Sequence, residues 1–137
     1  MNYSRRDLSL LLPALVAATE ASAQTPALPS KILAYEDMPV RGTGRSVLNG
    51  KNHKGWGVEW HLTQLEPGKE PHPPHHHEHV EMILVREGTV EVTILGKSAR
   101  IGPGGVAYVA SNEEHGWKNV GTTTAQYFIV TIGMERS

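Results

Sequence analysis

The chain has 137 residues and a formal net charge of −1, and this length favours a single domain. The balance of charges lacks the clustered lysine and arginine that nucleic acid requires, so nucleic acid is excluded as a partner. Cysteine is absent, which excludes disulfides, thiolate metal sites and cysteine nucleophiles. The eight histidines are unusual because five of them fall between His72 and His79. Such clustering indicates metal or proton chemistry.

Residues 1–23 are predicted to be a cleaved export signal. A start with adjacent arginines, Arg5 and Arg6, precedes the apolar run Leu10–Ala18 and the small-x-small site Ala21-Ser22-Ala23. The arginine pair resembles the twin-arginine signal, although the surrounding pattern is incomplete. The alternative, an amphipathic helix of the folded domain, is disfavoured by Pro13. We expect a periplasmic or extracellular protein without a stable membrane anchor, because the apolar run is too short to span a bilayer.

The rest of the chain is predicted to consist of an arm over residues 24–45, a barrel over residues 46–133 and a tail over residues 134–137. The arm is rich in proline and glycine and has few apolar runs, which is typical of an extended linker. Within the arm, Ile32–Tyr35 is a candidate edge strand.

The barrel segment is predicted to be a series of short strands. Runs rich in β-formers are separated by glycine and proline turns, and no helical period is visible. The predicted strands are Trp56–Leu65, Val80–Val85, Thr89–Ile94, Ala99–Ile101, Val106–Ala110, Trp117–Val120 and Tyr127–Ile132. Strands at this spacing favour an all-β fold, either an antiparallel sandwich or a barrel.

Alternation along the chain predicts which side chains share a face. Successive residues of a strand point to opposite sides, so one face of an extended segment would carry His75, His77, Glu81, Ile83 and Val85. The opposite face carries Val80, Met82 and Leu84. Both faces are largely apolar over residues 80–85, so we expect the interior on one side and a second sheet or subunit on the other.

The long strand Trp56–Leu65 allows two interpretations. Its apolar face is interpreted as core and carries Trp56, Val58, Trp60 and Leu62. In the alternative, the other face, with Glu59, His61 and Thr63, lies toward the metal. Glu59 or His61 would then be available as a general base.

Four residues form the candidate metal site. The spacing His75-x-His77-x3-Glu81 provides two imidazoles and a carboxylate, which are ligands that divalent first-row metals prefer. His115, which follows a polar loop, is the best fourth ligand. Three histidines and one glutamate would leave open positions on an octahedral ion for water or substrate.

Two motifs contain these ligands. The first is Gly68-x6-His75-x-His77-x3-Glu81-x6-Gly88, and the second is Gly96-x6-Pro103-x-Gly105 followed by His115-x3-Asn119. Both resemble the motifs of the cupin family. One extra residue precedes His75, which a loop can absorb. The resemblance covers about residues 46–133. It implies a double-sheet jelly-roll barrel, one metal ion held by the three histidines and the glutamate, and commonly a homodimer.

The other residues near the motifs have weaker predictions. His72 is expected on a loop and His76 in solvent. His79 is expected as a surface imidazole, with a place at the entrance of the site or a hydrogen bond to a ligand from behind as the alternative. Tyr108, Trp117 and Tyr127 are expected mainly to pack, with an aromatic wall around the ion as the alternative. Asn119 is expected to pair with backbone groups.

Fold alone does not select a reaction. The leading hypothesis is an exported, metal-dependent enzyme, oxygenase-like or other, that acts on a small polar molecule. The alternatives are a ligand-binding or sensing domain that uses the ion as an anchor, and a cupin whose metal serves stability. The ligand set accepts Mn, Fe, Ni, Cu or Zn as the divalent ion.

Overall fold

A computed structural model describes residues 26–134; the predicted export signal and the first two residues of the predicted arm therefore lie outside the described residues. A 3-10 helix, η1 (Tyr35–Asp37), precedes the strands. The strands are β1 (Val40–Arg41), β2 (Gly44–Lys51), β3 (Gly57–Leu65), β4 (Val80–Glu87), β5 (Val90–Ile94), β6 (Lys97–Ile101), β7 (Val106–Val109), β8 (His115–Asn119) and β9 (Ala125–Gly133). No helix within residues 26–134 is long and apolar enough to cross a membrane.

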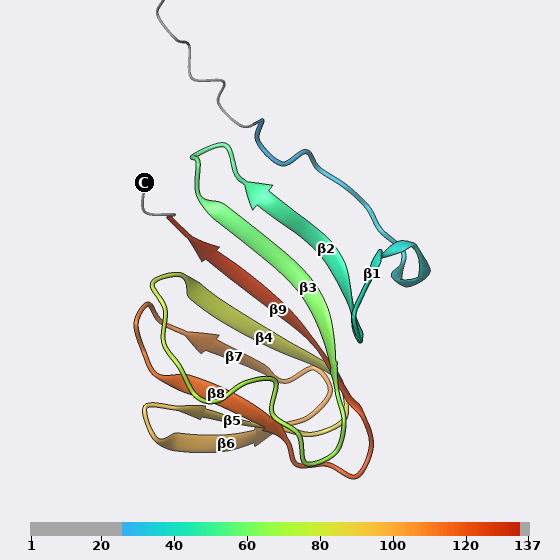
Figure 1. The fold of residues 1–137 in the computed structure, drawn as a ribbon, viewed down its shortest axis with the longest axis vertical. Helices are drawn as coiled ribbons and strands as arrows, with labels where there is room; N and C mark the ends of the chain where they lie inside the picture. The colour runs from blue at the N-terminus through green and yellow to red at the C-terminus, as the bar shows by residue number, and fades with distance from the viewer. Residues whose placement is uncertain (1–25, 135–137) are drawn as a thin grey trace, which may run out of the picture.

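The strands form two antiparallel sheets that enclose one core (Figure 1). The larger sheet has the order β1-β2-β3-β9-β4-β7, and the smaller has the order β6-β5-β8. The N-terminal arm runs beside β2 (Figure 1), where the Leu28 N–H donates to the Lys51 carbonyl at 2.8 Å. The predicted all-β fold with two antiparallel sheets is confirmed, and it is consistent with a jelly roll.

The core lies between the two sheets. Its members are apolar side chains from both sheets that are almost fully shielded from solvent. They are Leu65, Ile83, Val85, Val90, Val92, Val109, Trp117, Ala125, Tyr127 and Ile129. The predicted inward direction of Ile83 and Val85 is therefore confirmed. Alternation placed them correctly because β4 is regular over these residues.

The register of the larger sheet decides the two interpretations of β3. Glu59 pairs with Thr131 of β9, and Thr131 pairs with Glu81 of β4, so these three side chains share the inner face. Trp60 lies on the outer face and is 38% exposed, and Trp56, which precedes β3, is 45% exposed. The prediction that the apolar face of this strand is core is wrong, even though Leu62 on that face is buried.

The arm also differs from the prediction. Ile32–Tyr35 forms no strand, and Tyr35 instead begins η1. The ring of Tyr35 lies against two guanidinium groups, 4.5 Å from that of Arg45 and 4.1 Å from that of Arg86. These cation–π contacts hold the arm against the larger sheet, so side-chain contacts take the place of a ladder of backbone hydrogen bonds.

Candidate metal centre

Three separate elements supply the predicted ligands. Glu81 is the second residue of β4 and His115 the first of β8, and both are buried. His75 lies before β4 and bridges to β8, because the N–H of each of His75 and His115 donates to the carbonyl of the other at 3.0 and 2.9 Å. The expectation that one strand carries His75, His77 and Glu81 is wrong, because the proline-rich segment before His75 crosses to the smaller sheet and β4 begins only at Val80.

The four side chains nevertheless meet. Nε2 of His77 lies 2.8 Å from Oε2 of Glu81, and Nε2 of His115 lies 3.1 Å from the same oxygen. Ligand nitrogens of His75, His77 and His115 lie within 4.8 Å of one another. The cluster could therefore hold a single metal ion.

Backbone carbonyls fix two of the imidazole rings. Nδ1 of His77 lies 2.8 Å from the carbonyl of His79, and Nδ1 of His115 lies 2.8 Å from the carbonyl of Glu113. A carbonyl only accepts, so each Nδ1 must carry the proton. In the neutral rings the Nε2 lone pairs then face one carboxylate oxygen, and a metal ion or a proton between them removes this repulsion. The residues present therefore fit a divalent ion.

His75 adds a second sign of a missing partner. Its Nδ1 is buried and has no hydrogen-bond partner. Burial lowers the pKa of His75, and the neighbouring His72, His115 and His77 lower it further. A lowered pKa keeps the imidazole neutral near pH 7, which is the form that binds metal.

His79 lies next to the cluster, which the sequence pattern alone did not predict. Its ring stacks on that of His77, with 3.6 Å between centroids and 13° between planes. Its ligand nitrogen is within 4.8 Å of the ligand atoms of His77 and Glu81, and burial lowers its pKa. His76 is exposed, as expected. His72 is also exposed, and the centroid of its ring lies 4.2 Å from the centroid of the His75 ring.

Aromatic residues close the site on its inner side. The centroid of the Trp117 ring lies 5.5 Å from that of the His115 ring and 6.3 Å from that of the Tyr127 ring. The Tyr127 hydroxyl is buried without a hydrogen-bond partner, and burial raises its pKa to about 12. Tyr108, by contrast, is exposed on the outer face and takes no part in an aromatic wall.

Asn119 ties the end of β8 to the end of β3 and to the loop between β8 and β9. Its Nδ2 donates to the carbonyls of Leu65 and Thr123 at 2.7 and 2.8 Å, and its Oδ1 accepts from the Gly121 N–H at 2.9 Å. The predicted pairing with backbone groups is confirmed. These bonds fix the strand that presents His115.

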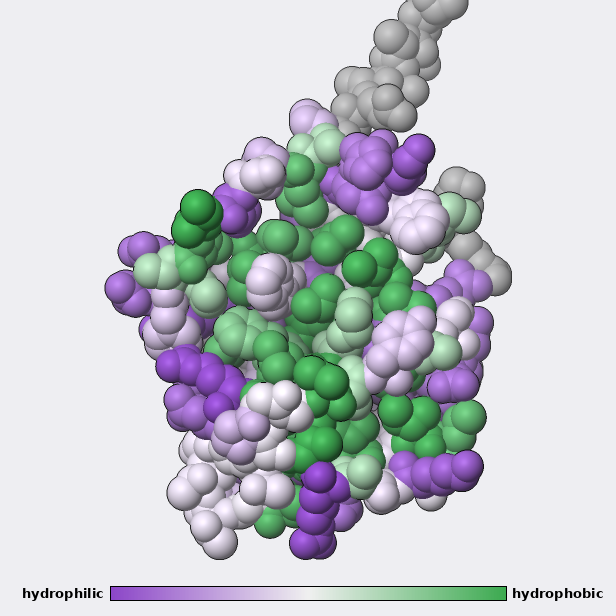
Figure 2. All heavy atoms as spheres, turned by 180° about the vertical axis from the view of Figure 1, so that it is seen from behind, coloured by the Kyte–Doolittle hydropathy of each residue, from purple (hydrophilic) through white to green (hydrophobic). Residues whose placement is uncertain are grey.

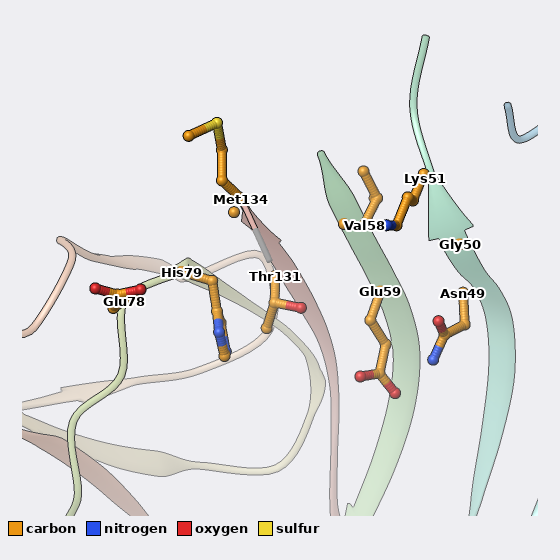
Figure 3. A pocket seen from close by; sticks show the side chains of 11 residues that line it. Asn49, Gly50, Lys51, Val58, Glu59, Glu78, His79, Thr131 and Met134 are labelled. Carbon is orange, nitrogen blue, oxygen red and sulfur yellow. The ribbon is translucent and has the colours of Figure 1, made fainter. Parts of the chain in front are cut away.

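A cavity of about 540 Å³ adjoins the cluster at His79. Its wall is mostly polar and comes from the β2–β3 hairpin, the end of β9 and the segment before β4 (Figure 3). The side chains of Asn49, Glu59, His79 and Thr131 lie around it (Figure 3). This size suits a small molecule.

The family comparison agrees with the fold and the motifs. A family model described as "Cupin domain" matches residues 61–131. The chain belongs to this family. Among the curated proteins, no match was found.

Solved structures give the same fold at low sequence identity. A protein from Thermus thermophilus is 26% identical, with a TM-score of 0.53, over 57% of this chain and 74% of that one. An RmlC-like cupin from Shewanella frigidimarina is 18% identical, with a TM-score of 0.60, over 79% and 95%. A predicted oxalate decarboxylase from Thermotoga maritima is 21% identical, with a TM-score of 0.57, over 76% and 100%. The last two likenesses show the fold alone.

Proposed function

We propose that this cupin is an exported, metal-dependent enzyme that acts on a small polar molecule, with one divalent ion held by His75, His77, Glu81 and His115. The observation that carries the proposal is the convergence of two Nε2 atoms on one carboxylate oxygen, at 2.8 and 3.1 Å, while backbone carbonyls accept hydrogen bonds from the two Nδ1–H groups. Mn, Fe, Ni, Cu and Zn all accept these ligands.

The surroundings of the cluster suit catalysis. A bound ion with these four ligands would supply Lewis-acid chemistry, and with iron or copper also redox chemistry. On the inner side, Trp117 excludes water from behind His115. On the other side, the cavity beside His79 gives a small molecule access to the cluster.

A ligand-binding or sensing role is the second candidate. Glu59 is the residue of the cavity wall best suited by type to act as a general base, and Arg41 already pairs with it at 3.0 Å. This ion pair engages Oε1 of the carboxylate, so that oxygen is less available to take a proton from a ligand. The pairing favours a site that holds its ligand without turnover.

Metal analysis followed by a turnover screen separates these functions. Protein purified from its native compartment is expected to carry close to one first-row metal ion per chain. The loaded protein is then screened under air with small acids, phenols and sugars, with oxygen uptake and product formation as readouts. If the protein binds a ligand in a metal-dependent way but turns none over with any of the five metals, the enzyme proposal fails. The ligand-binding function then takes its place. Absence of stoichiometric metal would refute both.

We also propose that the protein is a homodimer. The outer face of the larger sheet carries exposed apolar side chains, Trp60, Leu84, Val106 and Tyr108. They come from β3, β4 and β7: β4 pairs directly with β7, and β9 lies between β3 and β4. A contiguous patch of this kind on a small barrel supports an interface between copies.

Export is proposed from the signal-like pattern of residues 1–23. Mass spectrometry of protein from the native host is expected to show an N-terminus near residue 24 in a fraction outside the cytoplasm. A functional protein that retains residues 1–23 would contradict cleavage.

A further inference from the structure

The geometry points to a ligand class for the cavity: a small molecule that presents hydroxyl or amino donors, such as a polyol or an amino sugar, with Glu59 as the residue that holds the donor end. This inference rests on the proposed function, because it places the ligand beside the same cluster. It adds the chemistry by which the cavity selects the ligand.

Glu59 and the cluster lie on one inward row of the larger sheet. Thr131 of β9 is the only strand position between Glu59 and Glu81. Neighbouring strands are about 4.8 Å apart, so the two backbones are separated by about 10 Å. A small molecule can span this distance, with one end at the cluster and the other at Glu59.

The Glu59 side chain is held in place by contacts to one of its two carboxylate oxygens. Arg41 Nη1 donates to Oε1 at 3.0 Å, and Nδ1 of His61 lies 3.5 Å from the same oxygen. Both contacts that Glu59 makes within residues 26–134 go to Oε1, which leaves Oε2 to accept from a ligand. Arg41 lies outside the wall of this cavity, so it orients the carboxylate without presenting its guanidinium to the ligand.

The other polar groups of the wall suit the same class. The Thr131 hydroxyl and the Asn49 amide lie on either side of Glu59 (Figure 3). Both can accept from a ligand hydroxyl or donate to one. Lys51 and Glu78 also line the cavity and carry opposite charges. The charge preference is therefore set by Glu59, which attracts a donor or a cation and repels a ligand carboxylate.

Three sugars of one size test this selection: glucosamine, glucose and glucuronate, which place an ammonium, a hydroxyl or a carboxylate on one scaffold. Their affinities are measured by calorimetry on zinc-loaded and on chelator-treated protein. The wild type is expected to bind glucosamine and glucose more tightly than glucuronate. Glu59→Gln is expected to weaken glucosamine binding by roughly 10-fold, because a charge-assisted hydrogen bond is lost, and to leave zinc affinity unchanged.

Glu91→Gln is a matched control. Glu91 lies on β5, its side chain is 32% exposed against 33% for Glu59, and Arg100 donates to it at 3.1 Å from a neighbouring strand. It lies outside this cavity, so the affinities should not change. Equal losses in both variants, a preference for glucuronate, or no sugar binding to the wild type would overturn the inference. Failure to bind metal would refute the proposed function alone, because the preference is also measured without metal.

Discussion

The two faces of the larger sheet have opposite characters over the same strands. At the cluster end, the inner face carries Glu59, Thr131 and Glu81 in one row. The next row on the outer face carries Trp60, Val130, Met82 and Tyr108. Seen from behind, hydrophobic side chains gather across the middle of the molecule (Figure 2). In this chain the polar face of a strand is the one that borders the candidate metal centre. The apolar face of a strand is therefore not always the inner one.

Each face has its own requirement. The inner row borders a polar cavity and the cluster of side chains that could hold a metal ion, so polar groups there find partners. The outer row has no second sheet within the described residues, and several large apolar side chains remain exposed. The comparison therefore predicts that changes on the inner row affect metal and ligand, and changes on the outer row affect association.

The largest effect is expected from His77→Ala. Removal of one imidazole takes away both a metal ligand and the partner of Glu81, so we expect metal affinity to fall by at least about 100-fold. The barrel should remain folded, because His77 lies outside the regular strands. Competition titration with a chromogenic chelator measures the affinity, and circular dichroism checks the fold.

His76→Ala is the control for that change. His76 is the adjacent histidine and is exposed, so its loss should leave the metal affinity within a factor of about two, in keeping with the small effects of surface changes. An equal loss of affinity in both variants would show that the segment as a whole, and not His77, determines binding.

The next largest effect is expected from Leu84→Lys on the outer face. Leu84 is 44% exposed in the single chain, and a symmetric dimer would bury two lysines in place of two leucines. We expect dimer affinity to fall by at least about 30-fold, seen by light scattering as a shift toward the monomer at micromolar concentration. Ile32→Lys, a fully exposed change on the arm, should have no such effect. A monomeric wild type would refute the dimer.

The sequence predicted most strands and all four members of the cluster. Val90–Ile94 was found because it alternates strictly, and Glu81 was placed on the inner face by the same rule. The assignment of the two faces of Trp56–Leu65 to inside and outside failed. Hydrophobicity alone assigns tryptophan to the core, whereas the polar cavity and the uncovered sheet face depend on strands distant in sequence.

Two other features also depended on distant partners. β2 lacks a strong alternating pattern because a bulge between Ser46 and Leu48 shifts its register against β3. His75 joins the smaller sheet through His115, which is distant in the sequence, and local spacing carries no sign of that bridge. The role of Glu59 was left open for the same reason, since the spacing of β3 gives two faces and no direction.

A smaller effect is expected from Tyr127→Phe, which changes the buried inner face without touching a ligand. The lost hydroxyl has no partner, so stability at pH 7 should be unchanged or slightly higher. The folded pKa is about 12, against about 10 in the unfolded chain, so the unfolded state ionises first as pH rises. The wild type should lose about 2 kcal/mol between pH 10 and 12 that the variant keeps.

Urea unfolding at pH 7 and near pH 11 measures this difference. Tyr108→Phe, an exposed tyrosine of the outer face, should follow the wild type at both values. If Tyr127→Phe loses as much stability at high pH as the wild type, the Tyr127 hydroxyl is hydrated and not buried in the folded protein.

The smallest effect is expected from mild acid on the metal-free protein, and it again separates the two faces. Burial lowers the pKa of both His75 and His79 in the folded state. The unfolded chain therefore binds protons at these sites first as pH falls through about 6.5, and stability should fall from pH 7 toward pH 5. His75→Gln should flatten this slope, whereas His53→Gln, on an exposed turn, should not.

Zinc should steepen the slope, because protons compete with the metal for the same nitrogens. Urea unfolding across this range measures the slope. A flat slope in the metal-free wild type would mean that these imidazoles are solvated in the folded protein. Water would then reach the inner face as far as His75.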